Sequence, residues 1–273
     1  MRNARGFTLV ELVVSLTLAA IVVGFAGMLL TAPMQNYELQ SRRAELADAA
    51  GAAWPSLRDE LRTALPNSAR ARRNGNYVVL EFLAAVDWVR YKGSPGAPFT
   101  TAGTFRGLPV PFTASNHFLS VNNRGVGVPG GNAWALAGSI SAVGSTITVL
   151  AGALPGEQRV TVTPAPVFTA DSPRRRAYLV SGPVTYLCDE VAGTIRRYSG
   201  YAIAAAQTAR DTPAELLAAG AGVRLLAQDI SHCDFTAGPG SQTAAQLVTA
   251  RLTANRAGDT LELAEQAALE NLP

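Results

Sequence analysis

Residues 7–30 read FTLVELVVSLTLAAIVVGFAGMLL, and 18 of these 24 residues are hydrophobic. An α-helix of this length spans about 36 Å, which is enough to cross the hydrocarbon core of a bilayer. Arg2 and Arg5 precede the run, so the positive-inside rule predicts a cytoplasmic N-terminus and export of the rest of the chain. No second run of this kind follows in the 273 residues. We therefore expect a protein that crosses the membrane once.

Glu11 is the single charged residue in this apolar run. A carboxylate at the bilayer centre costs about 2.5–3.5 kcal/mol on insertion scales, so its presence indicates a function. Two simpler interpretations account for the run less well. A plain membrane anchor leaves Glu11 unexplained. A cleavable secretory signal has an apolar region of only about 7–15 residues, followed by a small-residue cleavage site that we do not find here.

The residues at the start of the run, Arg5-Gly6-Phe7-Thr8-Leu9-Val10-Glu11, resemble the N-terminus of type IV prepilins and type II secretion pseudopilins. The resemblance implies that prepilin peptidase cuts between Gly6 and Phe7 and methylates the amine of Phe7. Glu11 then becomes the fifth residue of the mature chain, where this family carries its acidic residue. The carboxylate and the Phe7 amine can neutralise one another, within one subunit or between two, which offsets their desolvation. We expect Glu11 to set the register of the subunit during assembly.

The helix is expected to continue through residues 31–66 as an amphipathic segment. Its apolar residues recur at spacings of three, four and seven, as on one stripe of a helix. They are Leu39, Leu46, Ala50, Ala53, Trp54, Leu57, Leu61 and Leu65. Pro33 and Pro55 are expected to kink or interrupt the helix, and Pro66 is expected to end it. The stripe predicts packing on the protein's own sheet, with a partner helix as the alternative.

From about Asn76 onward the sequence changes to short β-rich runs between turns rich in Gly, Pro and Asn. The runs are NYVVLEFL, VDWVRYK, HFLSVNN, STITVL, QRVTVT, RAYLVSG, PVTYLCD, TIRRYS, QLVTARLTA and TLELAEQ. Val160 and Val162 alternate with threonines, which is typical of a half-buried strand. Because no helix-length pattern separates most of the runs, we predict an antiparallel sheet.

The fold class that follows is α+β and pilin-like: a long N-terminal helix, half membrane-spanning and half amphipathic, packed on an antiparallel β-rich globular domain. Residues 93–144 are expected to be mainly loop, and a short helix is expected at 212–219. The expected domains are a leader peptide at 1–6, a transmembrane and filament-core helix at 7–30, its amphipathic continuation at 31–66, and a periplasmic β-rich domain at 67–273.

Cys188 and Cys233 are the two cysteines, and each ends a strand-like run. In an exported domain this pair predicts one disulfide. The alternative is a metal site or a thiol nucleophile, because Asp229, His232 and Asp234 cluster around Cys233. A single nearby histidine and an oxidising compartment disfavour that alternative. We expect no catalytic residue, no cofactor and no metal.

The formal net charge of +3 is too small to indicate nucleic-acid binding. Arg174-Arg175-Arg176 is the one cluster that could contact phosphates or anionic headgroups, and we interpret it as a charged entrance to a strand. We therefore expect no nucleic-acid partner.

Several stretches of the exported part resemble the MshO-type minor pilins of MSHA (mannose-sensitive haemagglutinin) pilus biogenesis. They are SRRAELADAA, LRDELRTALPNSARAR, YLVSGPVTYLCDE, TIRRYSGY and LVTARLTANRAGDTLEL; residues 93–170 match nothing. The resemblance implies a non-enzymatic, single-pass inner-membrane protein that contacts lipid first. An inner-membrane assembly platform then joins it to major and minor pilins in a pilus or pseudopilus. The alternatives are the minor pseudopilin J of type II secretion, a tip adhesin or DNA-binding pilin, and an anchored periplasmic enzyme.

Overall fold

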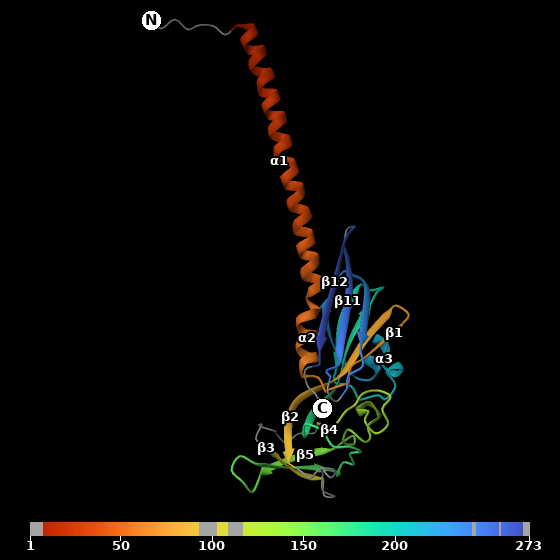
Figure 1. The fold of residues 1–273 in the computed structure, drawn as a ribbon. Helices are drawn as coiled ribbons and strands as arrows, with labels where there is room; N and C mark the ends of the chain where they lie inside the picture. Colours follow the sequence, from red (N-terminus) through yellow and green to blue (C-terminus); the bar gives the residue numbers. More distant parts are fainter. Residues whose placement is uncertain (1–7, 93–102, 109–116, 242–243, 257, 270–273) are drawn as a thin grey trace. The chain divides into compact units, whose positions relative to one another are not determined.

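The computed structural model describes two compact units, Met1–Ala47 and Asp48–Pro273, which we treat separately. The residues described are 8–92, 103–108, 117–241, 244–256 and 258–269, with side chains omitted at 28–36 and 38–39. The described residues of the first unit are almost entirely helix, and the second unit contains the sheets (Figure 1). A long N-terminal helix followed by an antiparallel β-rich domain confirms the predicted α+β class.

Helices occur at five places in the described residues. They are α1 Leu9–Gly51, α2 Ala53–Thr63, α3 Pro213–Ala218 and the 3₁₀ turns η1 Ala133–Ala135 and η2 Gln207–Ala209. The interruption predicted at Pro33 is absent, because α1 passes through it unbroken. A proline removes one main-chain hydrogen bond, and the ladder resumes beyond it. The break comes at Ala52 instead, which places Pro55 in the first turn of α2, where N–H groups have no helical partner.

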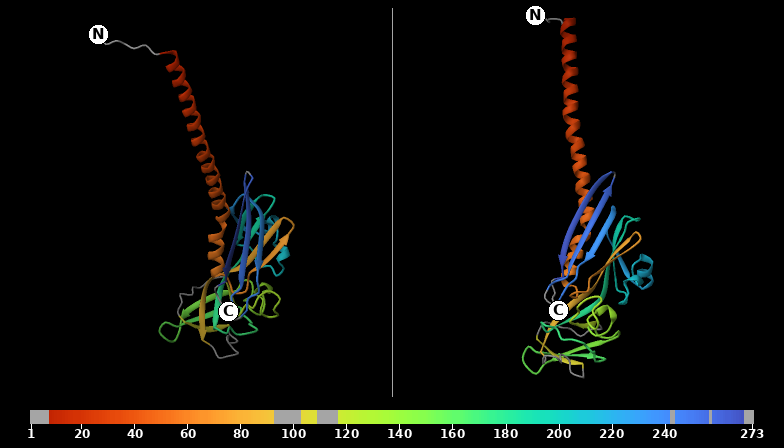
Figure 2. Two further views of the ribbon diagram at one scale, coloured as in Figure 1. Left: turned by 45° about the horizontal axis from the view of Figure 1, so that its top comes forward. Right: turned by 45° about the vertical axis from the view of Figure 1, so that its right-hand side comes forward.

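The strands of the described residues form one nine-stranded and one three-stranded sheet (Figure 2). Their bounds are β1 Arg70–Asn74, β2 Tyr77–Lys92, β3 Thr104–Leu108, β4 Phe118–Val121, β5 Thr146–Ala151, β6 Gln158–Thr163, β7 Arg176–Asp189, β8 Thr194–Ser199, β9 Gly222–Ala227, β10 Ile230–Ala237, β11 Leu247–Arg256 and β12 Asp259–Ala268. The large sheet runs β5-β6-β3-β2-β7-β8-β9, with β1 beside β2 and β4 beside β7. The small sheet runs β10-β11-β12.

The central pair of the large sheet is formed by two long strands, each of which we had predicted as two short ones. β2 and β7 pair from Tyr77 opposite Asp189 to Arg90 opposite Arg176. The division of β7 into two runs at Gly182-Pro183 is wrong, because the strand continues through both residues. Gly182 has φ +142°, which a residue without Cβ adopts freely, and the register shifts at this point of the pair. The bulge therefore allows β7 to continue through Gly-Pro, a dipeptide that is common in turns.

Three strands lie where no strand was predicted: β1, β3 and β9. β10 continues past Cys233, where a strand-like run was expected to end. β1 has the sequence RARRN, which lacks the β-branched and aromatic residues that favour strands. Its pairing with β2 and an ion pair to Glu81 hold it in the sheet. β3 lies within the predicted loop region 93–144. The short helix at 212–219 is confirmed as α3, with Thr212 and Glu215 forming a capping box.

α2 carries part of the predicted apolar stripe. Ala53, Trp54, Leu57 and Leu61 are all buried and repeat at helical spacing. The helix packs against β2 and β12, so this stripe lies on the protein's own sheets, as predicted (Figure 2). Each fully buried leucine contributes about 1.5–3 kcal/mol by removing apolar surface from water.

A buried ion pair joins β1 to β2. Arg70 Nε donates to Glu81 Oε2 at 2.7 Å, and Tyr201 Oη donates to Glu81 Oε1 at 2.8 Å. Arg70 also lies over the ring of Trp134, 3.6 Å from its centroid. Burial raises the pKa of Glu81, and the charge of Arg70 opposes that rise. The carboxylate and the guanidinium therefore depend on each other inside the domain.

We predict that Glu81→Ala lowers the free energy of unfolding by about 3–5 kcal/mol, because it leaves Arg70 buried without its carboxylate. The measurement is urea unfolding of the full chain in detergent, followed by tryptophan fluorescence. Glu60→Ala is the matched control, since Glu60 pairs with Arg197 at 2.8 Å on the partly exposed surface. It is expected to cost at most about 1 kcal/mol. Equal losses in the two variants would contradict the prediction.

Candidate functional site

The start of α1 is capped by two residues of the expected assembly segment. The Glu11 N–H donates to Thr8 Oγ1 at 3.3 Å, and Thr8 Oγ1 donates to Glu11 Oε2 at 3.4 Å. A threonine followed three residues later by a glutamate is a typical helix N-terminal arrangement. Glu11 thus lies in the first turn of α1 with an exposed side chain.

The next part of α1 is an apolar surface without an apolar covering in its own unit. Leu9–Gly27 has a mean hydropathy of 2.4, and none of this segment is buried. Leu9 is 79% exposed and Val23 is 71% exposed. Apolar surface on this scale marks a membrane or protein interaction site. The helix is long enough and apolar enough to cross a bilayer.

The same segment carries a family motif. Residues 1–27 match the prokaryotic N-terminal methylation motif. This match supports the type IV pilin and pseudopilin class, whose members are processed by prepilin peptidase and assemble with other pilins. Members of this class are structural proteins rather than enzymes. The apolar helix of this chain fits a pilin that is anchored in the membrane. No curated protein and no solved structure matches the chain.

The predicted cleavage residues Gly6 and Phe7 lie inside the matched motif but outside the described residues. Cleavage and methylation there stay predictions. The same holds for the role of Glu11 in register.

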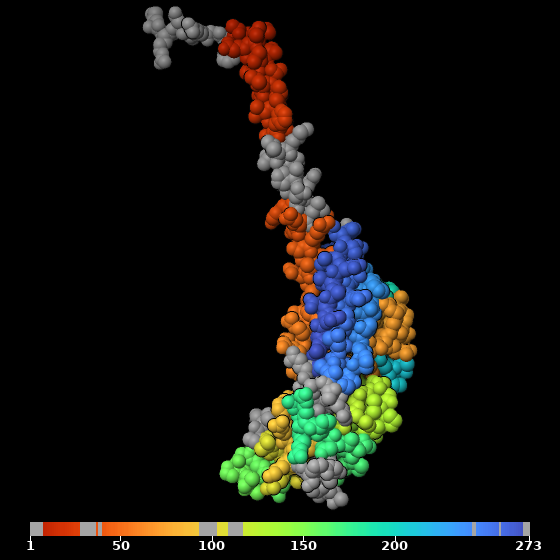
Figure 3. All heavy atoms as spheres, in the orientation of Figure 1, coloured from red at the N-terminus to blue at the C-terminus, as the bar shows by residue number. Residues whose placement is uncertain are grey.

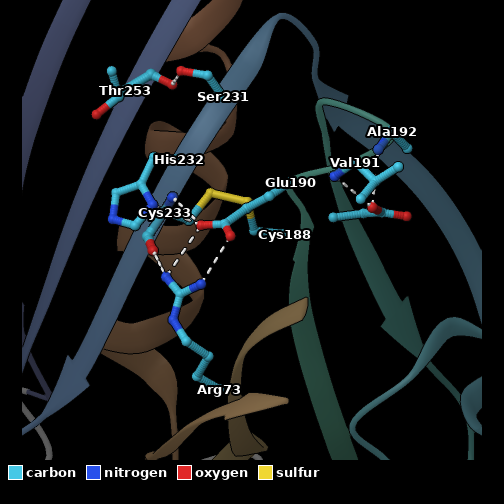
Figure 4. The surroundings of a disulfide bond; sticks show 10 residues. Arg73, Cys188, Glu190, Val191, Ala192, Ser231, His232, Cys233 and Thr253 are labelled. Carbon is cyan, nitrogen blue, oxygen red and sulfur yellow. Dashed lines mark hydrogen bonds and ion pairs between the residues drawn. A yellow bond between two sulfur atoms is a disulfide. The ribbon is translucent and has the colours of Figure 1, made fainter. Parts of the chain in front are cut away.

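The two cysteines form a disulfide, which is the predicted pairing. Cys188 lies near the end of β7 and Cys233 in β10, with 6.4 Å between their Cα atoms (Figure 4). The bond therefore links the large sheet to the small one. Both sulfurs are consumed by it, so neither is a thiolate that could act as a metal ligand or nucleophile. Among the described residues, no group of three or more His, Cys, Asp and Glu side chains is arranged to hold a metal ion.

The Glu190 carboxylate contacts several polar groups beside this disulfide (Figure 4). Arg73 donates to it through both terminal nitrogens, at 2.8 and 3.1 Å, and also donates to the Cys233 carbonyl. The Cys233 N–H donates to Glu190 Oε1 at 3.0 Å, and His232 Nδ1 lies 2.8 Å from the same oxygen. One carboxylate thus connects β1, β10 and the turn after β7. His232 faces a carboxylate here, and the charge of Asp234 acts on Arg73 of the same cluster.

The charge of Glu190 is stabilised in this setting. Partial burial raises the pKa of its carboxyl. Hydrogen bonds from Arg73 and from the Cys233 N–H lower this pKa by more, so the net effect is a lowered pKa. The hydrogen bond to Glu190 raises the pKa of Arg73. Sequence reasoning missed both residues. The available signal was the position of Glu190, two residues after Cys188.

We predict that replacing both Cys188 and Cys233 by serine lowers the free energy of unfolding by about 4 kcal/mol, as expected for the loop that this bond closes. Urea unfolding of the full chain in detergent measures the loss. Free-thiol titration of the denatured, unreduced wild type is the companion measurement, and we expect no reactive thiol. Two reactive thiols would contradict the disulfide.

We predict that Glu190 makes stability sensitive to acid. A carboxyl with a lowered folded-state pKa stabilises the fold above its unfolded pKa of about 4.3, and this contribution is lost as the pH falls through the folded-state pKa. The stability difference between wild type and Glu190→Gln should therefore be largest near pH 6 and shrink toward pH 3, measured by urea midpoints. Glu262→Gln, at an exposed position of β12, is the control and should show no such trend. A difference that stays constant with pH would contradict the assignment.

Proposed function

We propose that this chain is a non-enzymatic minor pilin of an MSHA-type type IV pilus that enters the filament or primes its assembly. One observation carries the proposal: an apolar helix that buries none of its span in its own unit begins within a prepilin-type methylation motif. Lipid covers such a helix before assembly, and the helices of other pilins replace the lipid afterwards. The MSHA assignment rests on the sequence resemblance of the exported part.

Processing would convert the N-terminus from an anchor into an assembly element. Cleavage between Gly6 and Phe7 removes Arg2 and Arg5, the charges that hold the segment at the cytoplasmic leaflet. It also creates a cationic amine on Phe7, close in sequence to the Glu11 carboxylate. In a helical bundle without water, pairing these two charges is far more favourable than leaving either one alone. Glu11 then selects the one axial position at which it meets an amine.

The second unit fits an exported location. A disulfide between Cys188 and Cys233 is typical of an oxidising compartment such as the periplasm. With the N-terminus cytoplasmic, residues 67–273 form the periplasmic domain, 31–66 its helical support, and 7–30 the segment that crosses the inner membrane. The partners are then prepilin peptidase, the inner-membrane assembly platform and other pilins.

The minor pseudopilin J of type II secretion is the second candidate, because pseudopilins carry the same N-terminal motif. The two candidates differ in the proteins that surround the chain. Cross-linking in cells followed by identification of the captured proteins distinguishes them: pilus subunits support the proposal, and secretion-system pseudopilins replace it with the second candidate.

We predict that Glu11→Ala reduces incorporation into filaments at least tenfold while leaving membrane insertion intact, because it removes one member of a desolvated charge pair. The measurement is the amount of the chain in sheared filaments relative to the membrane fraction. Glu11→Asp, which keeps the charge, should retain part of the incorporation. Ser15→Ala, four residues further along the same helix, is the neutral control. Wild-type incorporation of Glu11→Ala would contradict the register role.

We also predict that the mature chain begins at Phe7 and carries one added methyl group. Mass spectrometry of the N-terminal peptide from purified membranes measures both. Gly6→Val should block cleavage, because a β-branched side chain obstructs the close approach of the peptidase to this backbone. An intact leader on the wild-type chain in cells that hold active peptidase would contradict the proposed processing.

A further inference from the structure

One end of the large sheet has a core face and a solvent face. In β2, β3, β5 and β6, residues such as Val89, Phe105, Ile147 and Val160 are buried on the core face. The residues that alternate with them are exposed or half-buried. These strands lie together at one end of the second unit, coloured yellow to green in Figure 3. The exposed side chains of the solvent face are therefore accessible to a binding partner.

Cations occupy that solvent face in rows. Residues directly opposite one another on paired strands point to the same side of a sheet. Lys92 lies opposite Arg106, which lies opposite Arg159, and Arg90 lies opposite Arg176. Arg90 and Lys92 are two residues apart on β2, so both rows share one face. We call these five residues the cationic face.

This arrangement is unfavourable for the sheet by itself, because like charges directly opposite each other destabilise a strand pair. Three such pairs occur here: Lys92 with Arg106, Arg106 with Arg159, and Arg90 with Arg176. Glu157 neutralises part of the charge, at 3.1 Å from Arg106. Beside the neighbouring arginine cluster, the Asp171 carboxyl offsets part of the charge of Arg175. Among the described residues the cations of this face still outnumber these two carboxylates, so a net positive field remains.

The arginine cluster singled out in the sequence extends the same field. Arg174 and Arg175 line a surface hollow together with Arg90 and Lys92. Arg176 begins β7 and lies over the ring of Trp88, 4.6 Å from its centroid. The cluster and the cationic face thus form one surface, which combines residues from four separate parts of the chain.

We propose that the cationic face binds the phosphate backbone of double-stranded DNA. Arginine forks match phosphate oxygens, and fixed cations that neutralise phosphates release the condensed counterions of DNA into solution, which favours binding. Trp88 is half-buried beneath Arg176, so this ring offers no open platform for stacking. Single-stranded nucleic acids need such platforms, whereas a duplex keeps its bases stacked inside and presents its phosphates outward. The proposal stands independently of the pilin function.

The expectation of no nucleic-acid partner rested on the net charge of the chain. That sum hides the local arrangement, because acidic residues elsewhere cancel cations that the strand register brings together. A local field, not a net charge, attracts a polyanion.

The test uses the full chain in a non-ionic detergent and a fluorescein-labelled random-sequence 30-base-pair duplex. Fluorescence anisotropy gives the Kd at several NaCl concentrations between about 50 and 200 mM. We expect the logarithm of the association constant to fall with the logarithm of salt with a slope of about −4, as for four to five phosphate contacts. Replacing Arg90, Lys92 and Arg159 together by glutamine should flatten this slope by about 3 and weaken binding at 50 mM salt at least tenfold.

The matched control replaces Arg58, Arg251 and Arg256 by glutamine, which removes the same charge from exposed positions outside the cationic face. It should keep the wild-type slope. The thermal midpoint of the cationic-face variant should be at least that of wild type, because like-charge pairs have been removed.

Equal weakening in the two triple variants would overturn the proposal by showing an effect of net charge alone. Absence of binding by wild type would overturn it as well. Tighter binding of single-stranded DNA or of dextran sulfate than of the duplex, at equal salt, would replace duplex DNA with that polyanion and overturn the assignment.

Discussion

The pairing of β2 with β7 is the constraint on which the rest of the second unit depends. β1 and β3 attach to β2, and β4 and β8 attach to β7, so these two strands set the position of every other strand of the large sheet. The pair also supports the links to other elements, because Glu81 lies on β2 and Cys188 on β7. Loss of their register would separate the ion pair, the disulfide and the core clusters at once. The antiparallel pairing of β2 with β7 thus organises the domain, although the two strands are distant in sequence.

The two units differ in whether they bury their apolar side chains. The second unit buries its own: Val79, Leu80, Phe82 and Leu83 on β2 are fully enclosed. The first unit leaves the side chains of Leu9–Gly27 without cover, so its stability as a helix depends on lipid or on other helices. An apolar segment that is not covered within its own unit is therefore covered by lipid or by neighbouring helices, as the proposed pilin function requires.

Local patterns predicted the parts of the fold that local chemistry determines. Alternation at Val160 and Val162, a proline in the first turn of the helix expected at 212–219, and the helical spacing from Ala53 to Leu61 each led to the observed element. Prediction failed where tertiary contacts override local preference. Arg70 of β1 is held by Glu81 on the neighbouring strand, and β7 continues through Gly182-Pro183 at the point where its pairing with β2 shifts register. The cationic face was invisible for the same reason: its members are unremarkable one by one, and only the strand register brings them into rows.

The bulge between Ala84 and Asp87 has a consequence for how this domain can change over generations. Side chains alternate along a strand, so adding or deleting one residue between the bulge and Arg90 would turn Arg90 and Lys92 inward and expose Val89 and Tyr91. Such a change would place two charges in a closed apolar core. We therefore expect an insertion or deletion in this short stretch of β2 to destabilise the domain more than a point substitution on its outer side. The spacing of these residues keeps the charged and the apolar side chains on separate faces of the sheet.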